Sequence, residues 1–184
     1  MKIYEYQAKE LLSKYGIAVP KGGVASSVKK AASVYKSVLK KGRCVVKAQI
    51  YAGGRSQAGG IKVTSGLPRL KKIAKEILGK RLIVAQAGPK GILVKKILVE
   101  EAVPTAREFY LGITYDRGLG FPIVLACRMG GIEIEKTRKV NPKAIIRENI
   151  NPFTGILPYQ SRRIAYKLGL KGEAVEEAVR GISS

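Results

Sequence analysis

Histidine is absent from this sequence of 184 residues, and aspartate occurs only once, as Asp116. Without histidine, Ser-His and Cys-His catalysis within the chain are excluded. A metal site built on two aspartates is excluded as well, although glutamates could still serve. The two cysteines, Cys44 and Cys127, stand apart in apolar runs without CxxC spacing, which is typical of buried free thiols and not of a zinc site. We therefore assign no catalytic residue and no metal ligand to the chain.

Long apolar runs are missing too. The longest of them, such as residues 121–127, are far too short to span a bilayer, and residues 1–6 do not form an apolar signal segment. Apolar residues nevertheless make up 46% of the chain and charged residues 26%, which is ordinary for a protein that buries a core. These features predict a cytoplasmic globular protein with no membrane partner.

Acidic residues are scarce in one part of the chain. Residues 21–99 contain 19 lysines and arginines but a single acid, Glu76, so this segment carries most of the net charge of +22. The flanking segments, 1–20 and 100–184, are close to balanced. A phosphate-rich ligand, a solvated lysine surface and RNA are all consistent with such a segment. Its only aromatic residues are two tyrosines, which offer few bases a stacking platform and so count against RNA, while a solvated lysine surface is the more common explanation of such charge.

Helical and extended patterns alternate along the chain and predict an α+β fold. The expected helices are residues 5–15, 26–41, 67–78 and a last one from 161 that breaks near 169–172. The expected strands are residues 43–50, 61–63, 81–86, 92–100, 107–115, 121–128 and 130–136. We expect the basic segment, 21–99, to form one lobe, and residues 1–20 to join 100–184 in a second lobe.

Lys47 interrupts an otherwise apolar stretch, residues 44–48. An unpaired ammonium is costly to bury, so this lysine must have a carboxylate partner, extend to solvent or meet an anionic ligand. A loop with four glycines and Arg55 follows, at residues 53–60. Its N–H groups could form an anion nest and its arginine could hold phosphate oxygens. The loop is neither a Walker A motif nor GxGxxG, and a plain glycine-rich hairpin is the alternative. Beside Lys47, in a basic segment, it favours a phosphate site.

A β run at residues 97–102 ends in two acids, Glu100 and Glu101. Where a strand leaves one lobe for another, its free backbone groups can pair with the edge of a purine. The two carboxylates could then meet an amino group, a ribose or a nearby lysine, or they could be solvated. Glu108, at the start of the next expected strand, could pair with Lys47 or with the ribose.

Short motifs spread over essentially the whole chain resemble the β subunit of the succinyl-CoA synthetase family. They are Glu5-Tyr6-Gln7-Ala8-Lys9, Val45-Val46-Lys47-Ala48-Gln49, Ala52-Gly53-Gly54-Arg55, Ala58-Gly59-Gly60, Leu98-Val99-Glu100, Glu108-Phe109-Tyr110-Leu111-Gly112, Gly130-Gly131-Ile132-Glu133-Ile134-Glu135, Pro158-Tyr159-Gln160 and Lys167-Leu168-Gly169-Leu170. The wider group to which this family belongs includes malate–CoA ligase β subunits and the front of ATP-citrate lyase.

The resemblance implies an ATP-grasp fold, in which two lobes clamp ATP or GTP, here truncated at its C-terminal end. In the family, magnesium ligands and a further domain follow, so we expect the Mg²⁺ ligands beyond residue 184. The family's α subunit carries the phosphorylated histidine and is the expected partner. The isolated chain is accordingly expected to be inactive.

Seven residues match nucleotide-contacting positions of the family. They are Lys47, Gly54, Arg55, Ser56, Glu100, Val103 and Glu108. By resemblance, Lys47 contacts phosphate, residues 54–56 form the phosphate loop, and Glu100 and Glu108 contact adenine and ribose. Ser56 stands where the family usually has glycine. Val103 stands where a small polar residue often contributes, which leaves it a backbone contact.

Three functions remain open on the sequence. The first is the nucleotide-binding portion of an acid–CoA ligase, which couples ATP or GTP to acyl-CoA formation. The second is a non-enzymatic basic module that binds RNA or another polyanion. The third is a folded remnant of a split or truncated gene, without activity of its own.

Overall fold

The computed structural model describes residues 2–39, 42–130, 137 and 139–184. The chain forms two compact units, Met1–Pro104 and Thr105–Ser184. The sequence pattern groups residues 1–20 with 100–184, whereas in the structure residues 1–20 belong to the same unit as the basic segment. The reason is electrostatic, because the first helix forms ion pairs with that segment. That the units are the lobes of a nucleotide clamp stays a prediction.

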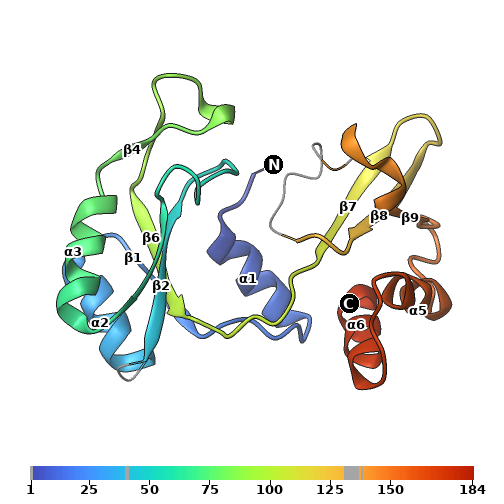
Figure 1. The fold of residues 1–184 in the computed structure, drawn as a ribbon, viewed down its shortest axis with the longest axis horizontal. Helices are drawn as coiled ribbons and strands as arrows, with labels where there is room; N and C mark the ends of the chain where they lie inside the picture. The colour runs from blue at the N-terminus through green and yellow to red at the C-terminus, as the bar shows by residue number, and fades with distance from the viewer. Residues whose placement is uncertain (1, 40–41, 131–136, 138) are drawn as a thin grey trace. The chain divides into compact units, whose positions relative to one another are not determined.

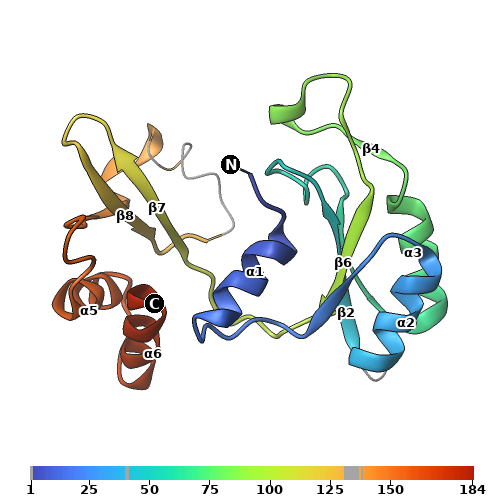
Figure 2. The same ribbon diagram turned by 180° about the vertical axis from the view of Figure 1, so that it is seen from behind.

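The first unit is built on an antiparallel sheet of four strands in the order β1-β6-β2-β3 (Figures 1 and 2). Its helices and strands are α1 (Glu5–Lys14), β1 (Gly22–Ala25), α2 (Val28–Val38), β2 (Arg43–Gln49), β3 (Ile61–Ser65), α3 (Leu67–Ile77), β4 (Arg81–Leu82), η1 (Ala85–Ala87), β5 (Ile92–Leu93) and β6 (Lys96–Glu101). The two long central strands, β6 and β2, run side by side, with Lys47 opposite Leu98.

Helices α2 and α3 cover one face of this sheet (Figure 1). Ser27 caps α2 by accepting a hydrogen bond from the Lys30 backbone N–H at 3.2 Å, as Ser and Thr commonly do. Tyr35 of α2 is part of the core, since its ring is buried and its hydroxyl donates to the Gly42 carbonyl at 3.1 Å. Pro68 lies in the first turn of α3, where no N–H is needed.

Helix α1 lies on the opposite face of the sheet (Figures 1 and 2), where its Glu5 pairs with Lys47 of β2. Val46 and its alternate neighbours on β2 are fully buried against α2 and α3. Because successive strand residues point to opposite faces, Lys47 points away from that core, as the sequence predicts. Helix α1 has no buried residue, and its Leu11 and Leu12 side chains are exposed. Polar contacts therefore hold α1 to the sheet.

The expected strand at residues 81–86 is wrong in length, and the expected strand 92–100 is two strands. Only Arg81 and Leu82 are paired as a strand, β4; the short helix η1 follows, and β5 and β6 are separate strands. Gly88 and Gly91 both have positive φ, at 65° and 59°, and the tight turn between them closes a ladder only two residues long. A longer ladder would need extended backbone in the residues that join the two strands, and the positive φ angles of these glycines are not extended.

The second unit is an antiparallel sheet in the order β7-β8-β9, packed against two helices. Its elements are β7 (Tyr110–Asp116), β8 (Phe121–Cys127), η2 (Pro142–Ala144), β9 (Ile146–Asn149), α5 (Pro158–Lys167) and α6 (Glu173–Ser183). The expected strands 107–115 and 121–128 pair as a hairpin, β7 and β8, and the expected break in the last helix lies between Gly169 and Gly172, both with positive φ. Strand β9 was not expected, and the expected strand 130–136 lies outside the described residues from 131 onward.

Buried apolar side chains hold this unit together. Val124 and Ala126 of β8 pack against Ile164 and Leu168 of α5. Within the described part of the chain, no helix is both long enough and apolar enough to cross a membrane.

Candidate functional site

Lys47 finds its partners in two carboxylates. Its Nζ lies 2.9 Å from Oε1 of Glu5, the first residue of α1, and 2.5 Å from Oε1 of Glu100 on β6. The lysine side chain keeps 21% of its surface exposed, so the ammonium is desolvated only in part. Of the alternatives that the sequence leaves for a lysine in an apolar strand, the structure shows the carboxylate partner, and the ammonium still reaches solvent.

Arg55 reaches back from the glycine-rich loop to the same carboxylate. Its Nη2 lies 2.6 Å from Oε2 of Glu5, and its Nη1 donates to the Ala48 carbonyl at 2.8 Å. Residues 55–59 form turns and no regular helix. Gly54 and Gly59 have φ near 73° and 72°, in the left-handed region that only glycine adopts freely. The loop thus turns back on itself and places its arginine beside β2.

Glu100 is a buried counter-ion. Its side chain is 3% exposed, and its two oxygens meet Lys47 and Lys9, which lies one turn after Glu5 on α1. A buried carboxylate needs such partners, because an unpaired charge is costly away from water. A contact from Glu100 to adenine or ribose stays a prediction.

The charges of this cluster shift each other's pKa values. Burial raises the pKa of Glu5, but hydrogen bonding and charge attraction from Lys47 and Arg55 outweigh it and bring the value down to about 2. Burial lowers the pKa of Lys47, but the hydrogen bonds and charges of Glu100 and Glu5 outweigh it and raise the value above its usual range. Glu5 and Lys47 are therefore both charged at neutral pH.

Three of the expected site residues are not among the charged groups of this cluster. Ser56 is exposed in the loop, where its carbonyl accepts a hydrogen bond from the Gly59 N–H at 3.1 Å. Val103 is half exposed near the end of the first unit. Glu108 belongs to the second unit, is exposed and precedes β7 instead of beginning a strand. That Glu108 faces the same cleft as Lys47 stays a prediction.

Sequence reasoning missed the central anion of the cluster, Glu5, and its neighbour Lys9. Their i,i+4 spacing on a helix was visible, as was their place in the family-like motif at the N-terminus. Neither signal shows what the helix packs against. The interaction with Lys47 and Arg55 joins residues more than 40 positions apart in the chain.

Two hollows border the cluster in the first unit. One, of about 360 Å³, is lined by Glu5, Gly53, Arg55 and Tyr51, among others, and so opens on the glycine-rich loop. The ring of Tyr51 stacks on that of Tyr4, with 4.0 Å between centroids. The other hollow, of about 410 Å³, lies beside α1 and β1 and reaches Glu100. Both are large enough for part of a small ligand.

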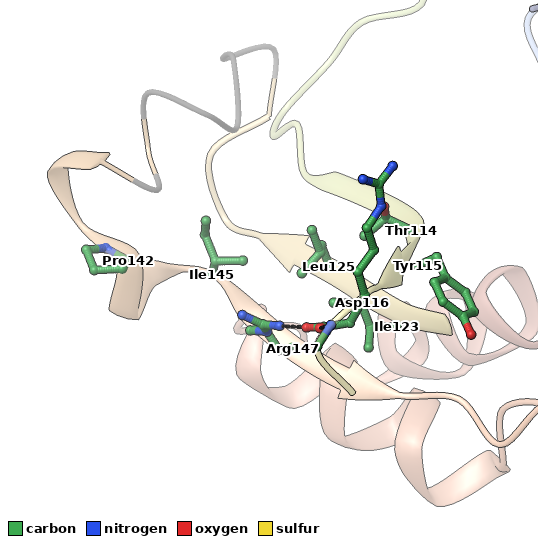
Figure 3. Close-up of a pocket in the computed structure, with 10 residues that line it drawn as sticks. Thr114, Tyr115, Asp116, Ile123, Leu125, Pro142, Ile145 and Arg147 are labelled. Atoms are coloured by element: carbon green, nitrogen blue, oxygen red, sulfur yellow. Dashed lines mark hydrogen bonds and ion pairs between the residues drawn. The ribbon is translucent and has the colours of Figure 1, made fainter. Parts of the chain in front are cut away.

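A further hollow, of about 520 Å³, lies in the second unit on the sheet (Figure 3). It is crossed by an ion pair between Asp116 and Arg147. The Asp116 carboxylate also accepts the backbone N–H groups of Leu119 and Gly118, and the first of these contributes most to holding its pKa below the usual range. This aspartate therefore shapes the hairpin turn. Across the described residues, no three His, Cys, Asp or Glu side chains gather to hold a metal.

Comparison with known proteins extends over nearly all of the chain. The model of the ATP-grasp domain family matches residues 2–184. The succinate–CoA ligase [ADP-forming] subunit beta of Geobacter sulfurreducens is 49% identical over 179 residues, which are 97% of this chain and 46% of that protein. Its namesake from Macrococcus caseolyticus is 44% identical over 180 residues, 98% of this chain and 46% of that protein. The resemblance seen in the sequence is confirmed, and the chain spans about half the length of these curated relatives.

Solved structures share the fold at low sequence identity. Dinucleotide-forming acetyl-coenzyme A synthetase 1 of Ca. Korarchaeum cryptofilum aligns with a TM-score of 0.69 and 23% identity, covering 98% of this chain and 79% of that one. ATP citrate lyase from Methanothrix soehngenii aligns with a TM-score of 0.61 and 18% identity, covering 84% and 36%. The predicted α+β, ATP-grasp-like fold is thus confirmed.

Proposed function

Because this chain belongs to the ATP-grasp family, we propose that it is the nucleotide-binding portion of an acid–CoA ligase and takes ATP or GTP. One observation carries the proposal. Lys47 from β2 and Arg55 from the glycine-rich loop converge on one face of the first unit, within hydrogen-bonding distance of one carboxylate. Two cations beside a turn rich in positive-φ glycines are the groups that a polyphosphate needs.

In this proposal the residues divide the nucleotide between them. Lys47 acts on the phosphates as a point charge, Arg55 as a fork of N–H donors, and residues 54–56 through their backbone. Glu100, Val103 and Glu108 take the base and ribose. A bound Mg²⁺ would supply charge neutralisation for the phosphates. We propose that its ligands lie beyond residue 184.

The rest of the reaction is proposed to lie on a partner chain. The curated relatives are named subunit beta, and this chain contains no histidine to accept a phosphoryl group. We propose an α-subunit-like partner that carries the phosphohistidine and the CoA site. The acid is then succinate, malate or a related compound. If it is succinate, the reaction belongs to the tricarboxylic acid cycle. We propose the cytoplasm as the place of the reaction.

A specific observation also supports the non-enzymatic alternative, a basic module for RNA or another polyanion. The outer faces of α2 and α3 carry exposed cations, which are Lys29, Lys30, Lys36, Arg69, Lys71, Lys72 and Lys75. They lie on the two helices that cover the face of the sheet opposite to Lys47. The two functions therefore use different surfaces of the same unit.

Binding measurements separate the two functions. The chain is titrated with Mg²⁺ and ATP, with Mg²⁺ and GTP, and with a single-stranded RNA, each at several salt concentrations. The affinities of the Lys47→Met and Lys71→Met variants are then compared with that of the wild type. The proposal expects nucleotide binding that Lys47→Met weakens and Lys71→Met leaves unchanged. The alternative expects RNA binding that only Lys71→Met weakens. In a plot of the logarithm of the RNA association constant against the logarithm of the salt concentration, the slope should be about −0.7 for each phosphate contacted. Absence of nucleotide binding would overturn the proposal.

A further inference from the structure

Glu5 stands between two cations that come from different elements. Its Oε1 meets Lys47 of β2 at 2.9 Å and its Oε2 meets Arg55 of the loop at 2.6 Å. Two positive groups this close repel each other, and the loop around Arg55 has the freedom that glycine gives. A shared anion offsets the repulsion and sets the separation of the two cations.

We propose that Glu5 is a positioning residue of the phosphate site, which holds Lys47 and Arg55 where both can face one phosphate group. The inference rests on the proposed nucleotide-binding function and adds a residue from the N-terminal helix to its site. The helix then does more than pack against the sheet, since its first turn orders the glycine-rich loop.

The hydrogen-bond donors of both cations support this role. An ammonium has three N–H donors and a guanidinium five. Among the described residues, Lys47 uses its donors on Glu5 and Glu100, and Arg55 uses its donors on Glu5 and the Ala48 carbonyl. Each cation thus keeps N–H groups for a ligand after Glu5 has been satisfied. The hollow of about 360 Å³ is lined by both Glu5 and Arg55, so a ligand in it would reach the free N–H groups of Arg55.

The opposite interpretation makes Glu5 an internal substitute for phosphate, which a nucleotide must displace. The two interpretations predict opposite effects when the charge of Glu5 is removed. If Glu5 positions the cations, its loss weakens binding of a polyphosphate. If Glu5 competes with the phosphates, its loss strengthens binding.

The test compares Glu5→Gln with Glu10→Gln in the full chain. Glu10 is exposed on the same helix, about 140° around it from Glu5. Both variants remove one negative charge, so general electrostatics should tighten anion binding slightly in both. Because α1 has no buried residue, neither change disturbs the core. We expect Glu5→Gln to weaken ATP binding with Mg²⁺ by about tenfold relative to Glu10→Gln, and Glu5→Asp to restore part of it.

Two readouts keep this inference separate from the proposed function. Calorimetry gives the ATP affinity, and NMR follows the Arg55 Nε–H and the backbone amides of residues 53–60 without any ligand. The inference expects these resonances to shift and exchange faster in Glu5→Gln only. Equal or tighter ATP binding by Glu5→Gln, or unchanged loop resonances, would overturn it. If the wild-type chain bound no ATP, the proposed function would fail, and the loop resonances would still decide whether Glu5 orders the loop.

Discussion

Replacing Lys47 with methionine is the sharpest test of the charge cluster. The change keeps the aliphatic stem that packs along β2 but removes an ammonium that lies 2.9 Å from Glu5 and 2.5 Å from Glu100. Glu100 is 3% exposed and cannot turn to solvent without opening the sheet. Its carboxylate would then depend on Lys9 alone, and Glu5 on Arg55 and a longer contact to Lys9.

The expected loss follows from these contacts. Breaking a fully buried ion pair costs about 3–5 kcal/mol, because one charge is left buried without its partner. Here both carboxylates keep a second cation and Lys47 is itself 21% exposed, so we expect a loss of about 2–3 kcal/mol in the free energy of unfolding. The loss should shrink as the pH falls toward 2, where Glu5 becomes protonated and its ion pair with Lys47 is lost in the wild type as well.

The neighbouring strand offers a matched control, Lys62→Met. Lys62 lies 2.8 Å from Glu76, but these side chains are 40% and 35% exposed, and such a surface pair contributes about 0–1 kcal/mol. Urea denaturation at pH 7 gives both losses, and amide hydrogen exchange in β2 and β6 assigns them to the first unit. If Lys47→Met cost no more than Lys62→Met, the argument that burial makes this cluster important would be refuted.

Three further outcomes are expected. Glu5 has a pKa of about 2 against an ordinary 4.5, so its ion pairs contribute their full stability above pH 4.5 and lose it as the pH falls through 2. The urea denaturation midpoints at pH 5 and pH 3 should therefore differ more in the wild type than in Glu5→Gln. Equal differences in the two proteins would count against the ion pairs. Gly60→Ala should destabilise the first unit by about 1–3 kcal/mol, because its new Cβ would lie 2.6 Å from Leu82 Cδ1; an unchanged urea midpoint would contradict the close packing. The purified chain alone should form no acyl-CoA from ATP, CoA and acid; turnover at roughly 1 per second or faster would mean that the catalytic site is complete within 184 residues.

Much of the local structure could be predicted because it depends on neighbouring residues. The helix after Ser27, the helix that begins near Pro68 and the hairpin before and after residues 117–120 each follow from spacing, caps or turn residues. The prediction erred at residues 81–100, where β-forming side chains are continuous. There the ends of the strands depend on two features of the tertiary structure. One is the turn between Gly88 and Gly91, and the other is the pairing of β4 with a strand only two residues long.

For the candidate site, the sequence by itself determined which face Lys47 would take, since strand alternation opposite Val46 leaves no other choice. It also determined that a glycine-rich turn would carry Arg55 close behind that strand. It could not determine the anion that joins them. Glu5 reaches Lys47 and Arg55 only because α1 lies on the open face of the sheet, held there by charge and not by buried apolar residues. An exposed glutamate and a counter-ion in a cluster look the same in a linear pattern, and only tertiary packing decides which of the two a residue becomes.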